Sequence, residues 1–190
     1  IGKNAGKTMG VAGNNGGVGP FTVGGCSAAT GGTGASNVAI GYAAGSALED
    51  GGCNVFLGWC AGALAKDNHL NVAIGKEAAL NVTGGCNVPI GRGAGKTVTS
   101  GQDNIFLGKY AASDSAGGTG KYNMFFGNSS GQKWTSGCHN IGQGYETLRY
   151  LETASYNIAI GAQALEGHST GKITGDANIA IGKEAMRNLC

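Results

Sequence analysis

The sequence predicts an all-β fold, a β-solenoid or β-roll built from short coils of equal length, about 17 residues each. A five-residue motif that begins with asparagine and ends with glycine recurs along the chain at nearly even spacing. Glycine accounts for 39 of the 190 residues, whereas only 13% of the residues are charged. A fixed period of roughly 20 residues means that one small unit is stacked many times. Residues 1–190 are therefore predicted to form a single repetitive segment.

The motif is clearest at 37–41, which reads Asn-Val-Ala-Ile-Gly. From Asn37 onward, successive motif asparagines are separated in number by 17, 17, 16, 17, 19, 17, 17 and 21. A weak copy at 15–19 and a truncated copy at 1–2 bring the total to about eleven repeats. The asparagines predicted to stack are Asn37, Asn54, Asn71, Asn87, Asn104, Asn123, Asn140, Asn157 and Asn178. The glycines that end the motif are Gly41, Gly58, Gly75, Gly91, Gly108, Gly127, Gly144, Gly161 and Gly182.

Each motif position has a physical reason. Val and Ile around a small or aromatic residue favour a short strand, because β-branched side chains fit a pleated, packed surface. The glycine allows the positive φ or the close backbone approach that is needed where the strand ends. Stacked asparagines can form an amide ladder of the kind that stabilises stacked strands. A small residue seven positions after each asparagine, such as Ala44 or Ala61, is expected where the coil is narrow.

Departures from the regular period predict insertions on the flank of the solenoid. The two longest steps between motif asparagines follow Asn104 and Asn157. The glycine-containing segments 117–120 and 171–175 are the expected sites of these insertions.

The middle residue of the motif predicts that several chains associate. In a strand with one face in water, every second residue should be polar. The middle residue is never charged and is never Ser, Thr, Asn or Gln. Both strand faces are therefore expected to be buried, one inside the coil and the other against further copies in an intertwined or side-by-side homotrimeric fibre. The alternative is a single-chain solenoid whose own flanking loops cover the second face.

The repeat resembles those of a known group of proteins. The unit Asn-Val-Ala-Ile-Gly-x-x-Ala-Gly, as at 37–45, is similar to the repeats of phage tail-fibre proteins, including those that end in a self-cleaving intramolecular chaperone. The copy at 54–62 resembles in particular the fibre-like structural proteins of phages that infect marine cyanobacteria. Segment 36–41 is more distantly similar to the Ser-Val-Ala-Ile-Gly head repeats of trimeric autotransporter adhesins, whose period is shorter. The resemblance covers essentially the whole chain and implies a homotrimeric β-structured fibre.

This resemblance implies a structural and non-enzymatic function. The chain is expected to be a rigid spacer in a virion appendage such as a tail fibre, with attachment to a glycan or protein of the host surface. A bacterial surface adhesin or extracellular filament subunit is the alternative. A tail-spike enzyme that degrades polysaccharides is a third hypothesis, which requires a cluster of carboxylates across adjacent coils. Glu77 and Glu184 each follow a lysine and are instead predicted to form salt bridges.

Composition argues against several other classes of partner. The net charge of +2 is spread along the chain without a run of Lys or Arg, so no nucleic-acid partner is indicated. No apolar stretch reaches the roughly 18 residues needed to span a bilayer, so no membrane insertion is expected. Segments 2–8 and 91–97 imitate a phosphate-binding loop, but Ile1 and Ile90 stand where that motif needs glycine. No cofactor and no metal are expected.

Aromatic residues in the links between strands are the candidates for a contact surface, because such rings stack on sugars or receptor groups. These candidates are Trp59, Tyr110, Trp134, Tyr145 and Tyr150. Packing between neighbouring chains is the alternative explanation for them.

Cysteines and histidines give weaker signals. The cysteines are expected to be small, buried apolar side chains, with interchain disulfides as the alternative. They are Cys26, Cys53, Cys60, Cys86, Cys138 and Cys190. His69, His139 and His168 are expected on the surface or in loops. Three copies of His139 on a trimer axis, which would form a metal site, are the alternative for that residue.

Overall fold

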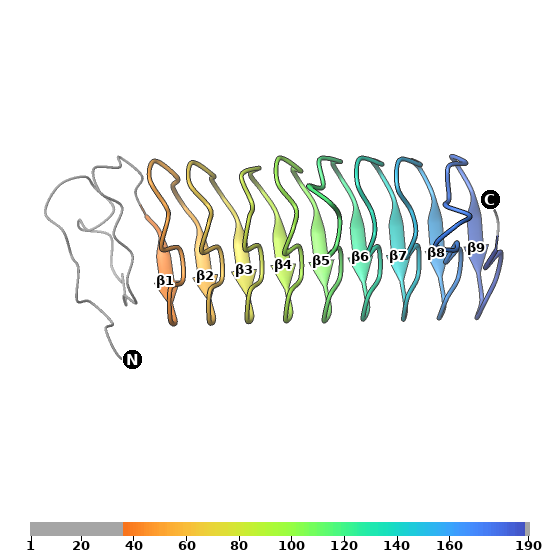
Figure 1. The fold of residues 1–190 in the computed structure, drawn as a ribbon, viewed down its shortest axis with the longest axis horizontal. Coiled ribbons are helices and arrows are strands. Elements are labelled where there is room, and N and C mark those ends of the chain that lie inside the picture. Colours follow the sequence, from red (N-terminus) through yellow and green to blue (C-terminus); the bar gives the residue numbers. More distant parts are fainter. Residues whose placement is uncertain (1–35, 189–190) are drawn as a thin grey trace, which may run out of the picture.

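A computed structural model describes residues 36–188 of the chain. This range forms an all-β solenoid whose nine strands make one parallel sheet, which confirms the predicted fold class. Figure 1 shows the coils stacked in chain order along a rod, with every strand on the same face. The strands are β1 (Val38–Ile40), β2 (Val55–Leu57), β3 (Val72–Ile74), β4 (Val88–Ile90), β5 (Ile105–Leu107), β6 (Met124–Phe126), β7 (Ile141–Gln143), β8 (Ile158–Ile160) and β9 (Ile179–Ile181). The copies predicted at 1–2 and 15–19 lie outside the described residues.

Successive strands pair directly in the register set by the motif. Val38 of β1 lies beside Val55 of β2, and the strand order across the sheet is the order in the sequence. The pairing continues past the strands, since the amide of Cys60 donates to the carbonyl of Tyr42 at 2.7 Å. Because each coil satisfies its backbone groups on the next coil, every motif position becomes a continuous row along the rod.

The two faces of the sheet are both apolar, and the middle residue of each strand is the one that points inward. Phe56 and Phe125 are fully buried, whereas the residues on either side of them are partly exposed. At β9, Ile179 and Ile181 are 63% and 68% exposed. We call the surface made by the first and third strand residues the outer sheet face. It consists of Val38, Ile40, Val55, Leu57, Val72, Ile74, Val88, Ile90, Ile105, Leu107, Met124, Phe126, Ile141, Gln143, Ile158, Ile160, Ile179 and Ile181.

In some coils, two positions fill the core in a complementary way. Where the middle strand residue is Phe125, the residue eight positions after the motif asparagine is Gly131, and a Cβ there would lie 2.4 Å from the phenyl ring. Where the middle residue is Gly142, the matching position holds Leu148, which is fully buried. The filled volume is therefore similar in the two coils, as close packing requires. The predicted narrow position is also buried, with Ala44 fully enclosed.

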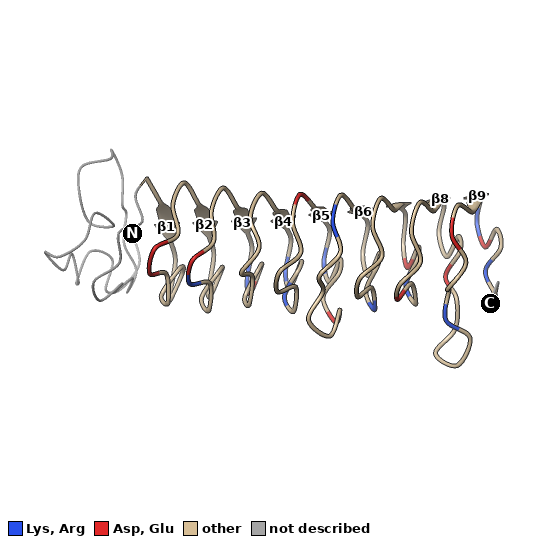
Figure 2. Cartoon of the chain, turned by 90° about the horizontal axis from the view of Figure 1, so that it is seen from above, with Lys and Arg blue, Asp and Glu red and all other residues tan. Residues whose placement is uncertain are grey.

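The longer coils carry insertions on the flank, as predicted. In the coil that contains β5, the amides of Asp114 and Thr119 donate to the carbonyls of Gln132 and Thr135, so the extra residues lie between Asp114 and Thr119. In the coil that contains β8, they precede Ile173, whose amide donates to the carbonyl of Tyr150. Figure 2 shows these two loops extending beyond their neighbours, and it shows the charged residues on the connections while the strands are uncharged.

Candidate binding surfaces

The motif asparagines form a hydrogen-bonded ladder. From Asn54 to Asn178, each donates its backbone N–H to the Oδ1 of the asparagine one coil earlier, at 2.9–3.1 Å. The side-chain amide of Asn54 also donates to Asn37 Oδ1 at 3.1 Å and to the carbonyl of Asn68 at 2.8 Å. One side chain thus ties a coil to its neighbour and closes the coil on itself. The ladder is a structural element, because its amides are consumed by these bonds.

The motif glycines form a second internal row. Gly41 has a φ of 134°, and a Cβ at this position would lie 2.3 Å from the carbonyl oxygen of Gly58. At Gly127 the corresponding distance to the Gly144 oxygen is 2.1 Å. The row therefore needs glycine both for its backbone angle and for the close contact between coils.

Four of the five candidate aromatic residues reach the surface. Trp59 and Tyr145 are 45% and 51% exposed, and Tyr110 and Tyr150 are half-buried. A hydrogen bond to Glu146 and then the negative charge of that carboxylate raise the pKa of Tyr145.

The prediction that Trp134 is a surface residue is wrong. Its ring is fully buried, 5.7 Å from Phe106 and 5.9 Å from Phe125 between centroids. A Cβ at Gly118 or Gly120 would lie 2.5 or 2.6 Å from the ring, so these glycines leave the space that the indole fills. Its Nε1–H donates to the carbonyl of Gly137 at 2.7 Å, which satisfies the indole inside the core.

Sequence reasoning missed a stack of rings at the residue just before the motif asparagine. His139 lies between Tyr122 and Tyr156, with ring centroids 4.9 and 5.0 Å apart. The two tyrosines are 50% and 61% exposed. Aligning the repeats by their asparagines would have revealed this row, because the three residues share one position. The hypothesis of a metal held by three copies of His139 stays a prediction.

The prediction of buried cysteines is wrong for those that the structure describes. Cys53 and Cys86 are exposed, Cys60 and Cys138 are half-buried, and all four are free thiols. Cys53, Cys86 and Cys60 have positive φ angles of 55–58°. Burial, and then the nearby charge of Glu77, raise the pKa of the Cys60 thiol. Cys26 and Cys190 lie outside the described residues.

A third row runs along the surface just after the motif glycine. It holds Tyr42 and Trp59 in two successive coils, and then Lys76, Arg92 and Lys109 in the next three, all exposed. The rings of Tyr42 and Trp59 stack with centroids 5.9 Å apart. The Nζ of Lys76 lies 4.4 Å from the centroid of the Trp59 ring, a cation–π contact. We call Lys76, Arg92 and Lys109 the basic row.

The basic row is surrounded by little negative charge. Arg92 and Lys109 both contact the ring of Tyr110, at 5.6 and 5.1 Å from its centroid. Glu77 lies beside the row and pairs with Lys96 at 2.7 Å and with Lys76 at 3.9 Å. The hydrogen bond from Lys96 is the main reason why the pKa of Glu77 is lowered. With Lys96 included, four cations face one carboxylate, so this patch carries a formal charge of +3.

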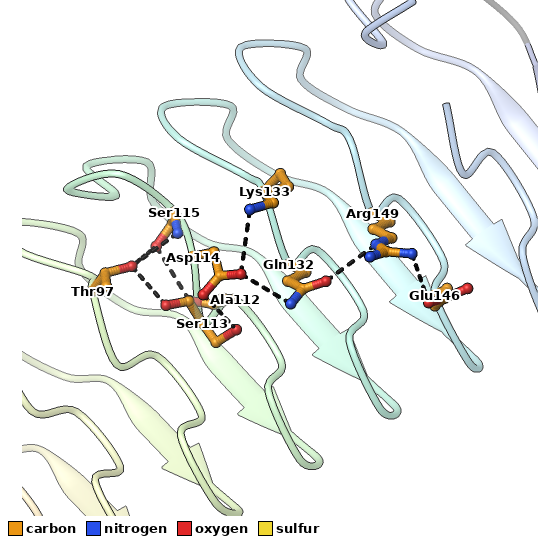
Figure 3. A network of polar contacts seen from close by, with 9 residues as sticks. All are labelled: Thr97, Ala112, Ser113, Asp114, Ser115, Gln132, Lys133, Glu146 and Arg149. Carbon is orange, nitrogen blue, oxygen red and sulfur yellow. Dashed lines mark hydrogen bonds and ion pairs between the residues drawn. The ribbon is translucent and has the colours of Figure 1, made fainter. Parts of the chain in front are cut away.

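The C-terminal coils carry a row of a different kind, which we call the ion-pair network. Asp114 accepts hydrogen bonds from Gln132 at 3.0 Å and from Lys133 at 3.3 Å. Arg149 donates to Gln132 at 3.1 Å and pairs with Glu146 at 2.7 Å. Figure 3 shows how these side chains connect neighbouring coils. Opposite charges and amides therefore alternate along this side of the rod.

Glu146 and Glu166 come from adjacent coils and both contact Arg149, at 2.7 and 4.0 Å. Glu166 also pairs with Arg187 at 2.8 Å and is 8% exposed in its side chain. These carboxylates therefore fit a structural role. Glu77 pairs with lysines, and Glu184 lies 3.4 Å from Lys183, as predicted for both residues.

Within residues 36–188, no three His, Cys, Asp or Glu side chains are grouped so that they could hold a metal ion. Over the same range, no helix has the length and apolar character needed to cross a lipid bilayer. No family model matches the chain, and neither the curated proteins nor the solved structures include one with significant similarity to it.

Proposed function

We propose that this chain is a structural segment of a fibre, a rigid spacer in a virion appendage such as a tail fibre, in which the copies associate as a homotrimer. The outer sheet face carries this proposal. Along the whole described rod it presents apolar side chains, and Gln143 is the only polar residue among those that define it. Contiguous apolar surfaces of this kind are rare on soluble monomers and usually mark an interface.

A further copy of the chain is the partner that fits this face best. The face repeats once per coil, so an identical sheet offers a matching row of apolar side chains with the same spacing. Three sheets around a common axis would cover all three outer faces. The alternative, in which the chain's own loops cover the face, has less support, because the connections in Figure 2 extend away from the strands.

Light scattering on the purified chain tests this proposal. We expect a mass near three times 18.8 kDa that does not change with reductant. Leu107→Lys, on the outer sheet face, should lower the mass toward that of a monomer. Leu64→Lys is the matched control, because Leu64 is 55% exposed and lies outside that face, compared with 39% for Leu107. A folded wild-type monomer would overturn the proposal.

A further inference from the structure

We infer that the basic row, together with the rings of Trp59 and Tyr42 beside it, binds a linear acidic polysaccharide that lies along the axis of the rod. This inference goes beyond the proposed spacer function, because it names the chemistry of a ligand on the surface of the rod. It rests on the arrangement of one side-chain row and does not depend on the number of chains in the fibre.

The backbone holds the three cations of the basic row in line. The amide of Gly93 donates to the carbonyl of Lys76 at 2.8 Å, and the amide of Tyr110 donates to the carbonyl of Arg92 at 2.9 Å. These bonds keep the residues on successive rungs, which are about 4.8 Å apart in a parallel sheet. The three side chains therefore start from a straight line about 10 Å long.

Stacking like charges in this way does not help the fold. Like charges on directly opposed neighbours of a sheet are destabilising. Elsewhere on the rod, lysines meet carboxylates of the preceding coil, as in Lys66–Glu49 and Lys133–Asp114, each at 3.3 Å. At the basic row, Arg92 and Lys109 instead contact Tyr110. A surface on which four cations share the single carboxylate of Glu77 is suited to an external anion.

The shape of the row favours a polysaccharide over other polyanions. Carboxylates or sulfates at regular intervals along a sugar chain can pair in sequence with a straight line of ammonium and guanidinium groups. The rings of Trp59 and Tyr42 continue the same line and present their exposed edges, since Trp59 stacks on Tyr42 and its ring is also contacted by Lys76. A nucleic-acid site typically needs a broader basic surface, and here the net charge is +2 and the pI about 8.2.

Binding to polygalacturonate, in which every sugar carries a carboxylate, tests the inference. The full chain is compared with a triple variant, Lys76→Gln, Arg92→Gln and Lys109→Gln. The matched control is Lys66→Gln, Lys121→Gln and Lys172→Gln, which removes the same amount of positive charge from positions outside the basic row. We expect the first variant to bind about tenfold or more weakly and the control to bind within about twofold of the wild type. Neutral dextran should not bind to any of them.

Each outcome separates the inference from the proposed function. Equal losses of affinity in both triple variants would show that binding depends only on overall charge, and would overturn the inference. An absence of binding by the wild type would overturn it as well. Tighter binding of single-stranded DNA than of polygalacturonate, lost in the same variant, would assign the row to nucleic acid instead. Light scattering on the same samples reports the assembly independently. A monomer that still binds polygalacturonate through the basic row would therefore overturn the fibre proposal and leave the present inference intact.

Discussion

The basic row and the ion-pair network occupy the same scaffold but use it in opposite ways. Both are rows in which one side chain per coil meets the next, on rungs about 4.8 Å apart. In the network, Arg149 lies between Gln132 and two carboxylates, so charge alternates and is neutralised. In the basic row, Lys76, Arg92 and Lys109 follow one another with the same sign. In a solenoid, the order of charges along a row can therefore decide whether that row stabilises the stacking of coils or forms a binding site.

The difference implies separate readouts for the two regions. Changes in the network should alter the melting temperature but not the binding of a polyanion. Changes in the basic row should alter the binding of a polyanion and leave the melting temperature nearly unchanged.

The largest effect is expected from Arg92→Glu, which would give the basic row the alternating order of the network. Binding of polygalacturonate should fall by more than about tenfold, because an attractive charge is replaced by a repulsive one at the centre of the row. The melting temperature should stay equal or rise, since the new carboxylate would face Lys76 and Lys109. Arg92→Lys, which keeps the charge, should retain most of the binding. An Arg92→Glu variant that binds as well as the wild type would contradict the separation of roles.

Glu166→Gln should produce the next largest effect, on stability. The substitution leaves Arg149 and Arg187 without this carboxylate while the amide keeps its shape. Because both arginines are partly exposed, we expect a loss of about 1–2 kcal/mol rather than the value for a fully buried pair. This corresponds to a fall in melting temperature of roughly 2–8 °C, measured by thermal unfolding. Glu152→Gln, at a more exposed pair with Lys172, is the control and should have a smaller effect.

Salt should separate the two regions without any mutation. Raising NaCl from about 50 to 200 mM should weaken polygalacturonate binding several-fold, because exposed charges are screened and counterions compete. The melting temperature should change little, since the network combines ion pairs with hydrogen bonds to amides. Binding titrations and melting curves at the same four salt concentrations give the salt dependence of the affinity and of the melting temperature. A flat binding curve would show that the contact is not electrostatic.

The smallest effect is expected at Glu77, the carboxylate within the basic row. Its pKa is lowered in the folded state, so its stabilising effect is present above the unfolded value of about 4.3 and is lost as pH falls through the folded value. Glu77→Gln should therefore lower the melting temperature slightly at pH 7, and the melting temperatures of the two proteins should converge as the pH falls below the folded pKa of Glu77. The same variant should bind polygalacturonate somewhat more tightly. A difference in melting temperature that grows on acidification would contradict this sign.

The fold could be predicted because it depends on periodicity, and a period survives individual substitutions. The asparagine and glycine positions, the narrow position and the flank insertions all follow from aligning the copies. The orientation of single side chains could not be predicted in the same way. Trp134 is buried because Gly118 and Gly120 of the previous coil leave room for it, a contact between coils that no single repeat contains. Cys53 and Cys86 stand directly before the motif asparagine, a position that is also exposed at Leu70, Tyr122 and Tyr156.

The basic row was missed for a related reason. Its charge is diluted when it is averaged over a chain with 13 basic and 11 acidic residues. Lys76, Arg92 and Lys109 share one position relative to the motif glycine, so a count of charge by repeat position would have found them. The sequence does not reveal which carboxylate each cation pairs with. Glu77, for example, lies closer to Lys96 than to Lys76, its neighbour in the sequence.

The balance of volume inside each coil also bears on how the length of such a rod can change. Where Phe125 is matched by Gly131, and Gly142 by Leu148, a large and a small residue of the same coil compensate each other. Loss or duplication of one whole repeat would then shorten or lengthen the rod by about 4.8 Å and leave the neighbours in register. Other coils depend on a neighbour, because the indole of Trp134 and the rings of Phe56 and Phe106 occupy space left by glycines of the coil before them. Coils coupled in this way would have to be gained or lost together, so single repeats can be exchanged only where no ring extends into the coil before it.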